Sequence, residues 1–161
     1  METACAIALG SNLGDSEQTI ETALAQLDQI DGMRLGLRSQ LYKTAPVGPP
    51  QPDYINACAI FHTTLSPEQV LQVLLLTETR CGRVRRERWG PRTLDLDLLL
   101  YSDRVMDTPS LTLPHPRMHE RAFVLMPLAE VAPELPHPIR QQTIKELLMQ
   151  VDISGVYPLV A

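Results

Sequence analysis

The sequence predicts an α+β domain built on a mostly antiparallel sheet. Segments with the alternation of strands are interleaved with segments that have helical spacing, in the order βαββαββαα. This order contains too few strand–helix–strand crossovers for a parallel sheet. With 161 residues and 44% hydrophobic content, the chain is expected to form one domain over residues 1–161.

The first half of the chain predicts three strands and one helix. We expect strands over residues 4–10, 34–43 and 55–64 and a helix over about 16–30. Asp15 and Gln18 resemble a capping box at the start of this helix, and apolar residues then recur at helical spacing. Four of the 14 prolines lie between positions 46 and 52, so this stretch should be an ordered surface loop outside the sheet.

The second half predicts a long helix, two further strands and two short helices. We expect them from Ser66 to Gly82, over 93–101, as a short strand within 102–116, near 119–126 and near 142–150. Ser66, Pro67 and Gln69 supply the N-cap, the first-turn proline and the capping-box partner of the long helix. Pro127 is expected to end the helix near 119–126, because proline lacks a backbone N–H.

Basic residues are concentrated in one short segment of an acidic chain. The net charge is −5, yet residues 80–92 hold six of the 14 lysines and arginines and a single acid, Glu87. This segment therefore carries +5 and the rest of the chain −10. Such a patch favours a compact anionic ligand over a nucleic acid, which would favour a basic face over the whole domain.

No segment resembles a membrane span or a secretory signal. We therefore expect a cytoplasmic protein with no membrane partner. The cysteines, Cys5, Cys58 and Cys81, are an odd number at wide spacing, which indicates reduced, buried thiols rather than disulfides or a metal site.

The segment RTLDLDLLLY predicts a strand that carries two acids on one face. Alternation sends Leu94, Leu96, Leu98 and Leu100 to one face and Asp95, Asp97 and Leu99 to the other. Two aligned carboxylates can bind Mg²⁺, which takes its other ligands from water and substrate phosphates. The alternative is a solvated strand face, on which the acids only keep an edge soluble.

The arginine segment GRVRRERWGPR lies immediately before these acids. Its guanidinium groups suit phosphate oxygens, and the acids suit the metal that phosphates also bind. A triphosphate such as ATP would satisfy both, and the alternative is a solvated basic loop. Trp89 lies inside this segment and is expected to stack on a flat ligand or to seal the loop.

Other polar residues lie near the ends of predicted strands. Tyr54 and Asn56 follow the proline loop, where a ring and an amide could bind a flat heterocycle, although Asn56 could equally be a turn residue. His115, Arg121 and Phe123 add two phosphate-binding groups and an aromatic ring after the last strand. The segment GSNLGD is a turn signal and matches neither a P-loop nor a dinucleotide-binding motif.

Together these segments resemble the 6-hydroxymethyl-7,8-dihydropterin pyrophosphokinase family of folate biosynthesis. The matching segments are ALGSNLGD, YKTAPVGPPQPDYINA, GRVRRERWGPRTLDLDLLLY and LPHPRMHERAFVLMPLAEVAPEL, which run from the first strand nearly to the end of the chain. The resemblance implies transfer of the β,γ-pyrophosphoryl group of ATP to the hydroxymethyl oxygen of the pterin, with release of AMP. It also implies a ferredoxin-like α/β/α sandwich with mobile loops, in a protein that acts as a monomer.

The resemblance further implies roles for individual residues. For metal binding and catalysis it implies Asp95 and Asp97 as ligands of two Mg²⁺ ions, together with Arg83 and Arg92. For ATP it implies Glu78, Arg85, Arg88, Leu98, Thr112, His115 and Arg121. For the pterin it implies Thr44, Ala45, Val47, Tyr54, Asn56, Trp89 and Phe123. The departures are Ala45 where the family has proline, Leu75 where a polar nucleotide contact can occur, and an arginine loop one residue shorter than in some members.

The implied mechanism relies on positioning and charge rather than on covalent participation by the protein. No dedicated general base is evident, and Asp97 or a lowered pKa of the metal-bound hydroxyl are the two hypotheses for proton removal. Two other functions stay open. One is a nucleotidyl transferase, in which the Gly-Ser turn and the Asp-x-Asp strand would lie closer in sequence. The other is an RNA-binding module, which the two phenylalanines and the acidic net charge disfavour.

Overall fold

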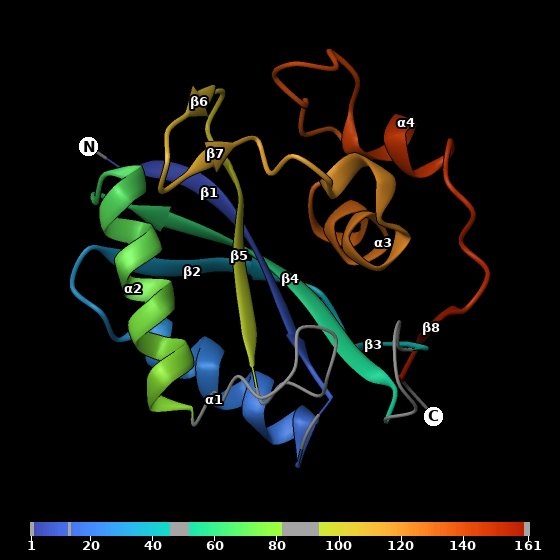
Figure 1. Ribbon diagram of the computed structural model, residues 1–161, viewed down its shortest axis with the longest axis horizontal. Helices are drawn as coiled ribbons and strands as arrows, with labels where there is room; N and C mark the ends of the chain where they lie inside the picture. Colours follow the sequence, from blue (N-terminus) through green and yellow to red (C-terminus); the bar gives the residue numbers. More distant parts are fainter. Residues whose placement is uncertain (1, 13, 46–51, 82–93, 160–161) are drawn as a thin grey trace.

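In the computed structural model, which describes residues 2–12, 14–45, 52–81 and 94–159, a six-stranded sheet is covered by helices on both faces (Figure 1). Its strands are β1 (Thr3–Ser11), β2 (Met33–Arg38), β3 (Tyr42–Thr44), β4 (Tyr54–Thr63), β5 (Asp95–Tyr101) and β8 (Val156–Pro158). A second, two-stranded sheet pairs β6 (Met106–Asp107) with β7 (Thr112–Leu113). The helices are α1 (Ser16–Asp28), α2 (Pro67–Arg80), α3 (Ala122–Val131) and α4 (Ile144–Leu148), with a 3₁₀ turn, η1, over Met118–Glu120.

The strand order in the large sheet is β5-β1-β4-β3-β8, and β2 also pairs with β4. All of these pairings are antiparallel. On one face, α1 and α2 pack against the sheet through a core that includes Leu24, Leu74 and Phe61. On the other face, α3 and α4 pack through a second core that includes Leu125 and Ile144. The predicted α+β fold with a ferredoxin-like sandwich is confirmed.

Strand β1 lies in the middle of the sheet, between β4 and β5. Both of its faces are covered, because Ile7 and Leu9 belong to the core under α1 and α2, whereas Ala6 belongs to the core under α3 and α4. A strand buried on both faces reads as a continuous apolar run, which is why the segment over residues 4–10 could be predicted.

The two long helices begin where the sequence predicts. In α1 the Asp15 carboxylate accepts the N–H of Gln18 at 3.2 Å. In α2 the Ser66 hydroxyl accepts the N–H of Gln69 at 3.2 Å, and the Gln69 side chain accepts the N–H of Ser66 at 2.9 Å. These contacts satisfy N–H groups that the first turn of a helix leaves without partners.

The strand predicted over 34–43 is instead two strands, β2 and β3, which pair with different parts of β4. Ser39 joins them opposite Cys58: its N–H donates to the Cys58 carbonyl at 2.9 Å, and its hydroxyl accepts the Cys58 N–H at 3.0 Å. The same hydroxyl donates to the Gln40 carbonyl at 2.7 Å. A side-chain oxygen therefore replaces a backbone acceptor at the point where β4 changes partner.

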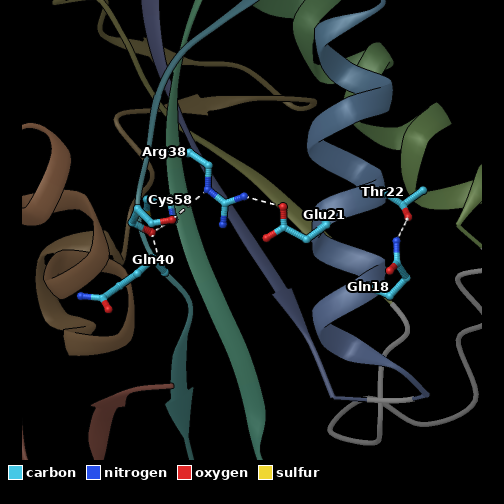
Figure 2. A network of polar contacts seen from close by, with 7 residues as sticks. Gln18, Glu21, Thr22, Arg38, Gln40 and Cys58 are labelled. Carbon is cyan, nitrogen blue, oxygen red and sulfur yellow. Dashed lines mark hydrogen bonds and ion pairs between the residues drawn. The ribbon is translucent and has the colours of Figure 1, made fainter. Parts of the chain in front are cut away.

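The end of β2 is also held from α1. The Arg38 guanidinium lies 2.6 Å from the Glu21 carboxylate on α1 (Figure 2). Its Nε donates to the Ser39 carbonyl at 3.0 Å. Both ionic groups are partly exposed, so the ion pair itself contributes little to stability. Together the two contacts link α1 to the end of β2.

Two other predictions are wrong in detail. Leu100 does not share a face with Leu98, because a bulge at Leu99 shifts the register against β1 and places both Leu99 and Leu100 in the core under α3 and α4. Pro127 does not end the helix near 119–126: the structure has the turn η1 and then α3, with Pro127 buried inside α3. Burial of the apolar α3 residues offsets the missing proline hydrogen bond. Strand β8 was not predicted.

Helix α3 is tied to β3 by one carboxylate. The Tyr42 hydroxyl donates to Glu130 Oε1 at 2.7 Å, and the Gln40 N–H donates to Glu130 Oε2 at 3.0 Å. Burial, followed by the hydrogen bond to Glu130, raises the pKa of Tyr42 to about 12. The phenol therefore remains a donor, and the contact sets the spacing between β3 and α3.

The connection from α3 to α4 is organised by His137, which is 3% exposed. Its Nδ1 accepts the N–H of Arg140 at 3.0 Å and that of Ile139 at 3.3 Å. Burial lowers the pKa of His137, and His119 and Arg140 lower it further. The neutral imidazole is the form that can accept these two bonds.

Of the helices that the structure describes, none is both long and apolar enough to cross a membrane. Cys5, Cys58 and Cys81 are free thiols, with Cys81 partly exposed and the other two buried as predicted.

Ser39→Ala is expected to lower the free energy of unfolding by about 1–3 kcal/mol, because it leaves the buried Cys58 N–H without an acceptor. Urea denaturation followed by circular dichroism measures this change. Ser110→Ala, which alters an exposed serine in the loop before β7, is the control and should unfold like the wild type. Equal unfolding midpoints for the two variants would contradict the role of Ser39.

The free energy of unfolding is expected to decrease as the pH falls from about 7.5 to about 5.5, in part through His137. The folded-state pKa of His137 is lowered, so the unfolded chain takes up the proton first and acid favours unfolding. Urea titrations at several pH values give the free energy of unfolding as a function of pH. The slope of this free energy against pH should be smaller for His137→Gln than for the wild type. His62→Gln, on β4, is the matched control, and a slope that His137→Gln leaves unchanged would refute the prediction.

Candidate active site

A cavity of about 590 Å³ lies between the sheet and the N-terminal end of α3. It opens on the face of the sheet that α3 and α4 cover, where β1 ends and β4 and β5 begin. Eight of the predicted site residues line it: Thr44, Ala45, Tyr54, Asn56, Asp95, Asp97, Arg121 and Phe123. These residues come from segments far apart in the sequence, and the sheet together with the start of α3 brings them to one place.

The register of β1 against β4 and β5 explains the grouping of Asn56, Asp95 and Asp97. Gly10 on β1 is paired with Asn56 on β4 and with Asp95 on β5. One step earlier on the same face, Ala8 is paired with Asp97. Because side chains opposite each other in a sheet point to the same face, the amide and both acids must project into one cavity.

One side of the cavity is polar and ordered. The Asn56 side chain is 7% exposed and donates from Nδ2 to Thr44 Oγ1 at 2.9 Å. Thr44 is in turn paired with Tyr54 across β3 and β4. Asn56 therefore lies inside a strand, which excludes the alternative that it is a turn residue. Phe123, at the start of α3, supplies an aromatic ring to the same cavity.

Asp95 and Asp97 are only partly exposed and line the cavity, so they do not form an open, solvated edge. The backbone between them is fixed from outside the sheet, because the Leu96 N–H donates to Glu78 Oε2 at 2.7 Å. Glu78 lies near the end of α2 and is 4% exposed. In the part of the chain that the structure describes, no three histidine, cysteine or acidic side chains gather as a metal site. Two carboxylates suit Mg²⁺ nevertheless, because this ion keeps several ligands from water and phosphates.

Two basic side chains, those of Arg121 and His115, lie near these acids. Arg121 lines the cavity, with its Cζ 5.6 Å from the centroid of the Phe123 ring. His115 Nδ1 accepts the N–H of Arg117 at 3.2 Å, which leaves Nε2 as the donor of the neutral ring. Burial lowers the pKa of His115, although the charge of Asp97 opposes this effect. Burial also lowers the pKa of the Arg121 guanidinium, again against the charge of Asp97.

Some predicted site residues lie elsewhere. Glu78, Leu98, Thr112 and His115 are not in the lining of this cavity. Leu98 is 4% exposed in the core under α1 and α2, and Thr112 begins β7. Six others lie outside the described residues: Val47, Arg83, Arg85, Arg88, Trp89 and Arg92. The contacts predicted for all of these residues stay predictions.

The cavity also has walls that sequence reasoning missed. They include Ala8, Gly10, Arg117, Glu120, Asp152 and Ser154. Ala8 and Gly10 lie at the end of the predicted strand over residues 4–10, just before the predicted turn. This position was the one signal in the sequence that could have marked them as residues of the cavity. Asp152 and Ser154 precede β8, a short strand with no clear alternation, so no local signal pointed to them.

A family model described as 7,8-dihydro-6-hydroxymethylpterin-pyrophosphokinase (HPPK) matches residues 6–133. The chain is 46% identical over 152 residues to 2-amino-4-hydroxy-6-hydroxymethyldihydropteridine pyrophosphokinase of Synechocystis sp., covering 94% of this chain and 78% of the relative. It is also 46% identical over 145 residues to the protein of the same name from Haemophilus influenzae, covering 89% of this chain and 90% of the relative.

Solved structures agree on the fold. Plasmodium falciparum HPPK-DHPS wild type with pteroate aligns with a TM-score of 0.75 at 14% identity, covering 93% of this chain and 42% of that chain. A second crystal structure of wild-type Plasmodium falciparum HPPK-DHPS aligns with a TM-score of 0.73 at 14% identity, covering 93% of this chain and 45% of that chain. The present chain thus spans less than half of these longer proteins, and at this identity the likeness concerns the fold alone. The family model and the bacterial relatives establish that this chain belongs to the 7,8-dihydro-6-hydroxymethylpterin-pyrophosphokinase family.

Proposed function

We propose that this cavity is where the chain transfers the β,γ-pyrophosphoryl group of ATP to the hydroxymethyl group of 6-hydroxymethyl-7,8-dihydropterin. The products are AMP and the pterin diphosphate, and the reaction belongs to folate biosynthesis. One observation supports this location most directly: a single cavity joins a paired set of carboxylates, Asp95 and Asp97, to an amide and an aromatic ring, Asn56 and Phe123. The first pair suits a metal-bound phosphate chain, and the second suits a flat heterocycle.

Asp95 and Asp97 would hold Mg²⁺, with two ions expected. The carboxylates fit this cation because both line the cavity from one face of β5. When bound, Mg²⁺ supplies positive charge that neutralises the phosphate oxygens. Asn56 on β4 and Asp95 on β5 are both paired with Gly10 on the strand between them. A pterin bound by Asn56 would therefore lie close to the acids, which would orient its hydroxyl group for attack.

The remaining residues of the cavity position the pterin and exclude water. Tyr54 and Phe123 would contact the ring faces, while Asn56 and Thr44 would bind the ring edge through donors and acceptors already aligned with each other. Arg121 would stabilise negative charge that develops on the transferred group. The arginines of the segment 82–93 would bind the phosphate oxygens, to which their guanidinium groups are suited.

We further propose a cytoplasmic monomer that binds neither nucleic acid nor membranes. The acidic net charge of −5 supports the absence of a nucleic-acid partner. Sedimentation of the purified protein tests the monomer, and a dimer mass at micromolar concentration would refute it.

The function is tested by incubating the protein with ATP, Mg²⁺ and 6-hydroxymethyl-7,8-dihydropterin. AMP is expected to appear only when the pterin is present. Release of pyrophosphate instead of AMP would indicate a nucleotidyl transferase. Steeply salt-dependent RNA binding without ATP consumption would indicate an RNA-binding module.

Asp97→Ala is expected to reduce turnover by about 10²- to 10³-fold or more, because it removes a group that acts on charge in the transition state. Binding of the pterin alone should remain measurable, since Asn56 and Phe123 are unchanged. Steady-state AMP release at saturating Mg²⁺ measures the loss. Asp103→Ala, which changes an exposed acid in the turn after β5, is the matched control. Near-normal turnover of Asp97→Ala would remove this residue from the metal site.

A further inference from the structure

Gly10 lies at the centre of the site yet is absent from its predicted residues. It lines the cavity and is paired with Asn56 on one side and Asp95 on the other. It is not among the glycines with positive φ, so its backbone conformation is one that alanine can adopt. Backbone freedom therefore does not explain a glycine at this position, and the space above its Cα must be considered.

That space is taken up by the Asn56 amide. A Cβ atom placed on Gly10 would lie 3.2 Å from Asn56 Oδ1 and 3.9 Å from the Ile55 carbonyl oxygen. The first distance is tighter than an ordinary van der Waals contact, so the amide would have to move. No atom of Asp95 lies within 4 Å of the same position, so the acid on the other side would not be touched.

Asn56 has little room to adjust. Its side chain is 7% exposed, and its Nδ2 is held by Thr44 Oγ1 at 2.9 Å. Moving Oδ1 away from β1 would rotate the amide about this bond and misalign the donor with Thr44. The two contacts together fix which edge of the amide faces the cavity.

We propose that Gly10 is a positioning residue for the pterin: its missing side chain keeps the Asn56 amide in place, with Nδ2 on Thr44 and Oδ1 above β1. The amide oxygen is then aligned to accept a hydrogen bond from an N–H group on the edge of a flat heterocycle. This role rests on the proposed function in one respect, namely that the heterocycle is the pterin. The contact between Gly10 and Asn56 does not depend on it. A side chain at Gly10 would disturb Asn56, which faces the pterin, and would not touch Asp95, which faces the metal. Its effect on pterin binding can therefore be measured apart from any effect on the metal.

The test uses Gly10→Ala in the full chain. The dissociation constant for 6-hydroxymethyl-7,8-dihydropterin, measured by fluorescence titration without ATP, is expected to rise about 3- to 10-fold, which corresponds to one weakened hydrogen bond. The KM for the pterin should rise in parallel. The KM for ATP and the Mg²⁺ dependence should stay within about twofold of the wild type, because Asp95 is out of reach. Equal losses for ATP and pterin, or no loss for either, would overturn the proposal.

A double-mutant cycle with Asn56→Ala distinguishes this contact from a general disturbance of the strand. Once Oδ1 has been removed, adding Gly10→Ala should cause no further loss of pterin affinity. Additive losses would overturn the proposal. If Gly10→Ala alone were too unstable to assay, recovery of folding in the double variant would support the contact, and an unfolded double variant would refute it.

The outcome can be separated from that of the proposed function. If the wild type fails to release AMP with the pterin, the function is wrong whatever the cycle shows. If the wild type is active and the cycle is additive, only the role of Gly10 is wrong.

Discussion

The antiparallel pairing of β1 with both β4 and β5 is the constraint on which the site depends. Because β1 ends where its two neighbours begin, residues separated by about half of the chain are placed in one row across the sheet. Asn56, Gly10 and Asp95 form that row, with Asp97 one step behind. A slip of one residue in either pairing would turn Asn56 or the acids to the opposite face, under α1 and α2. The continuous apolar run of β1, buried on both faces, resists such a slip.

The walls of the cavity are held by contacts that lie outside it. Glu130 joins α3 to β3 through Tyr42, and so helps to set the spacing between Phe123 on α3 and Thr44 on β3, both of which line the cavity. Ser39 helps to fix where β3 begins, because it is hydrogen-bonded to Cys58. This β4 residue lies between the part of β4 that pairs with β2 and the part that pairs with β3. Preorganisation of this kind reduces the conformational cost of binding a ligand. The hydrogen bonds of Tyr42 and Ser39, both of which are buried, thus bear on the stability of the fold and on the geometry of the site together.

Local patterns revealed much of this fold, and long-range contacts account for what they missed. The helix caps at Asp15 and Ser66 and the alternation around Asp95 and Asp97 are properties of neighbouring residues, so the sequence alone sufficed for them. The break at Ser39 depends on where β4 changes partner, and the bulge at Leu99 depends on the register against β1. Pro127 is tolerated inside α3 because tertiary burial outweighs propensity. Likewise Gly10 and Arg117 become site residues only once the strands are paired and α3 is docked.

Strand β5 carries the two acids of the cavity and also has an edge that no further strand of the described chain covers. In the described part of the chain it is an edge strand of the large sheet, so its outward backbone groups need partners other than a strand. Glu78 accepts the Leu96 N–H, and the His115 N–H donates to the Leu99 carbonyl at 2.9 Å. Within the described residues, a side-chain carboxylate and a loop N–H thus satisfy groups on this edge in place of a further strand. Asp95 and Asp97 therefore line the cavity from a strand that is held on one side by β1 and on the other by these two hydrogen bonds.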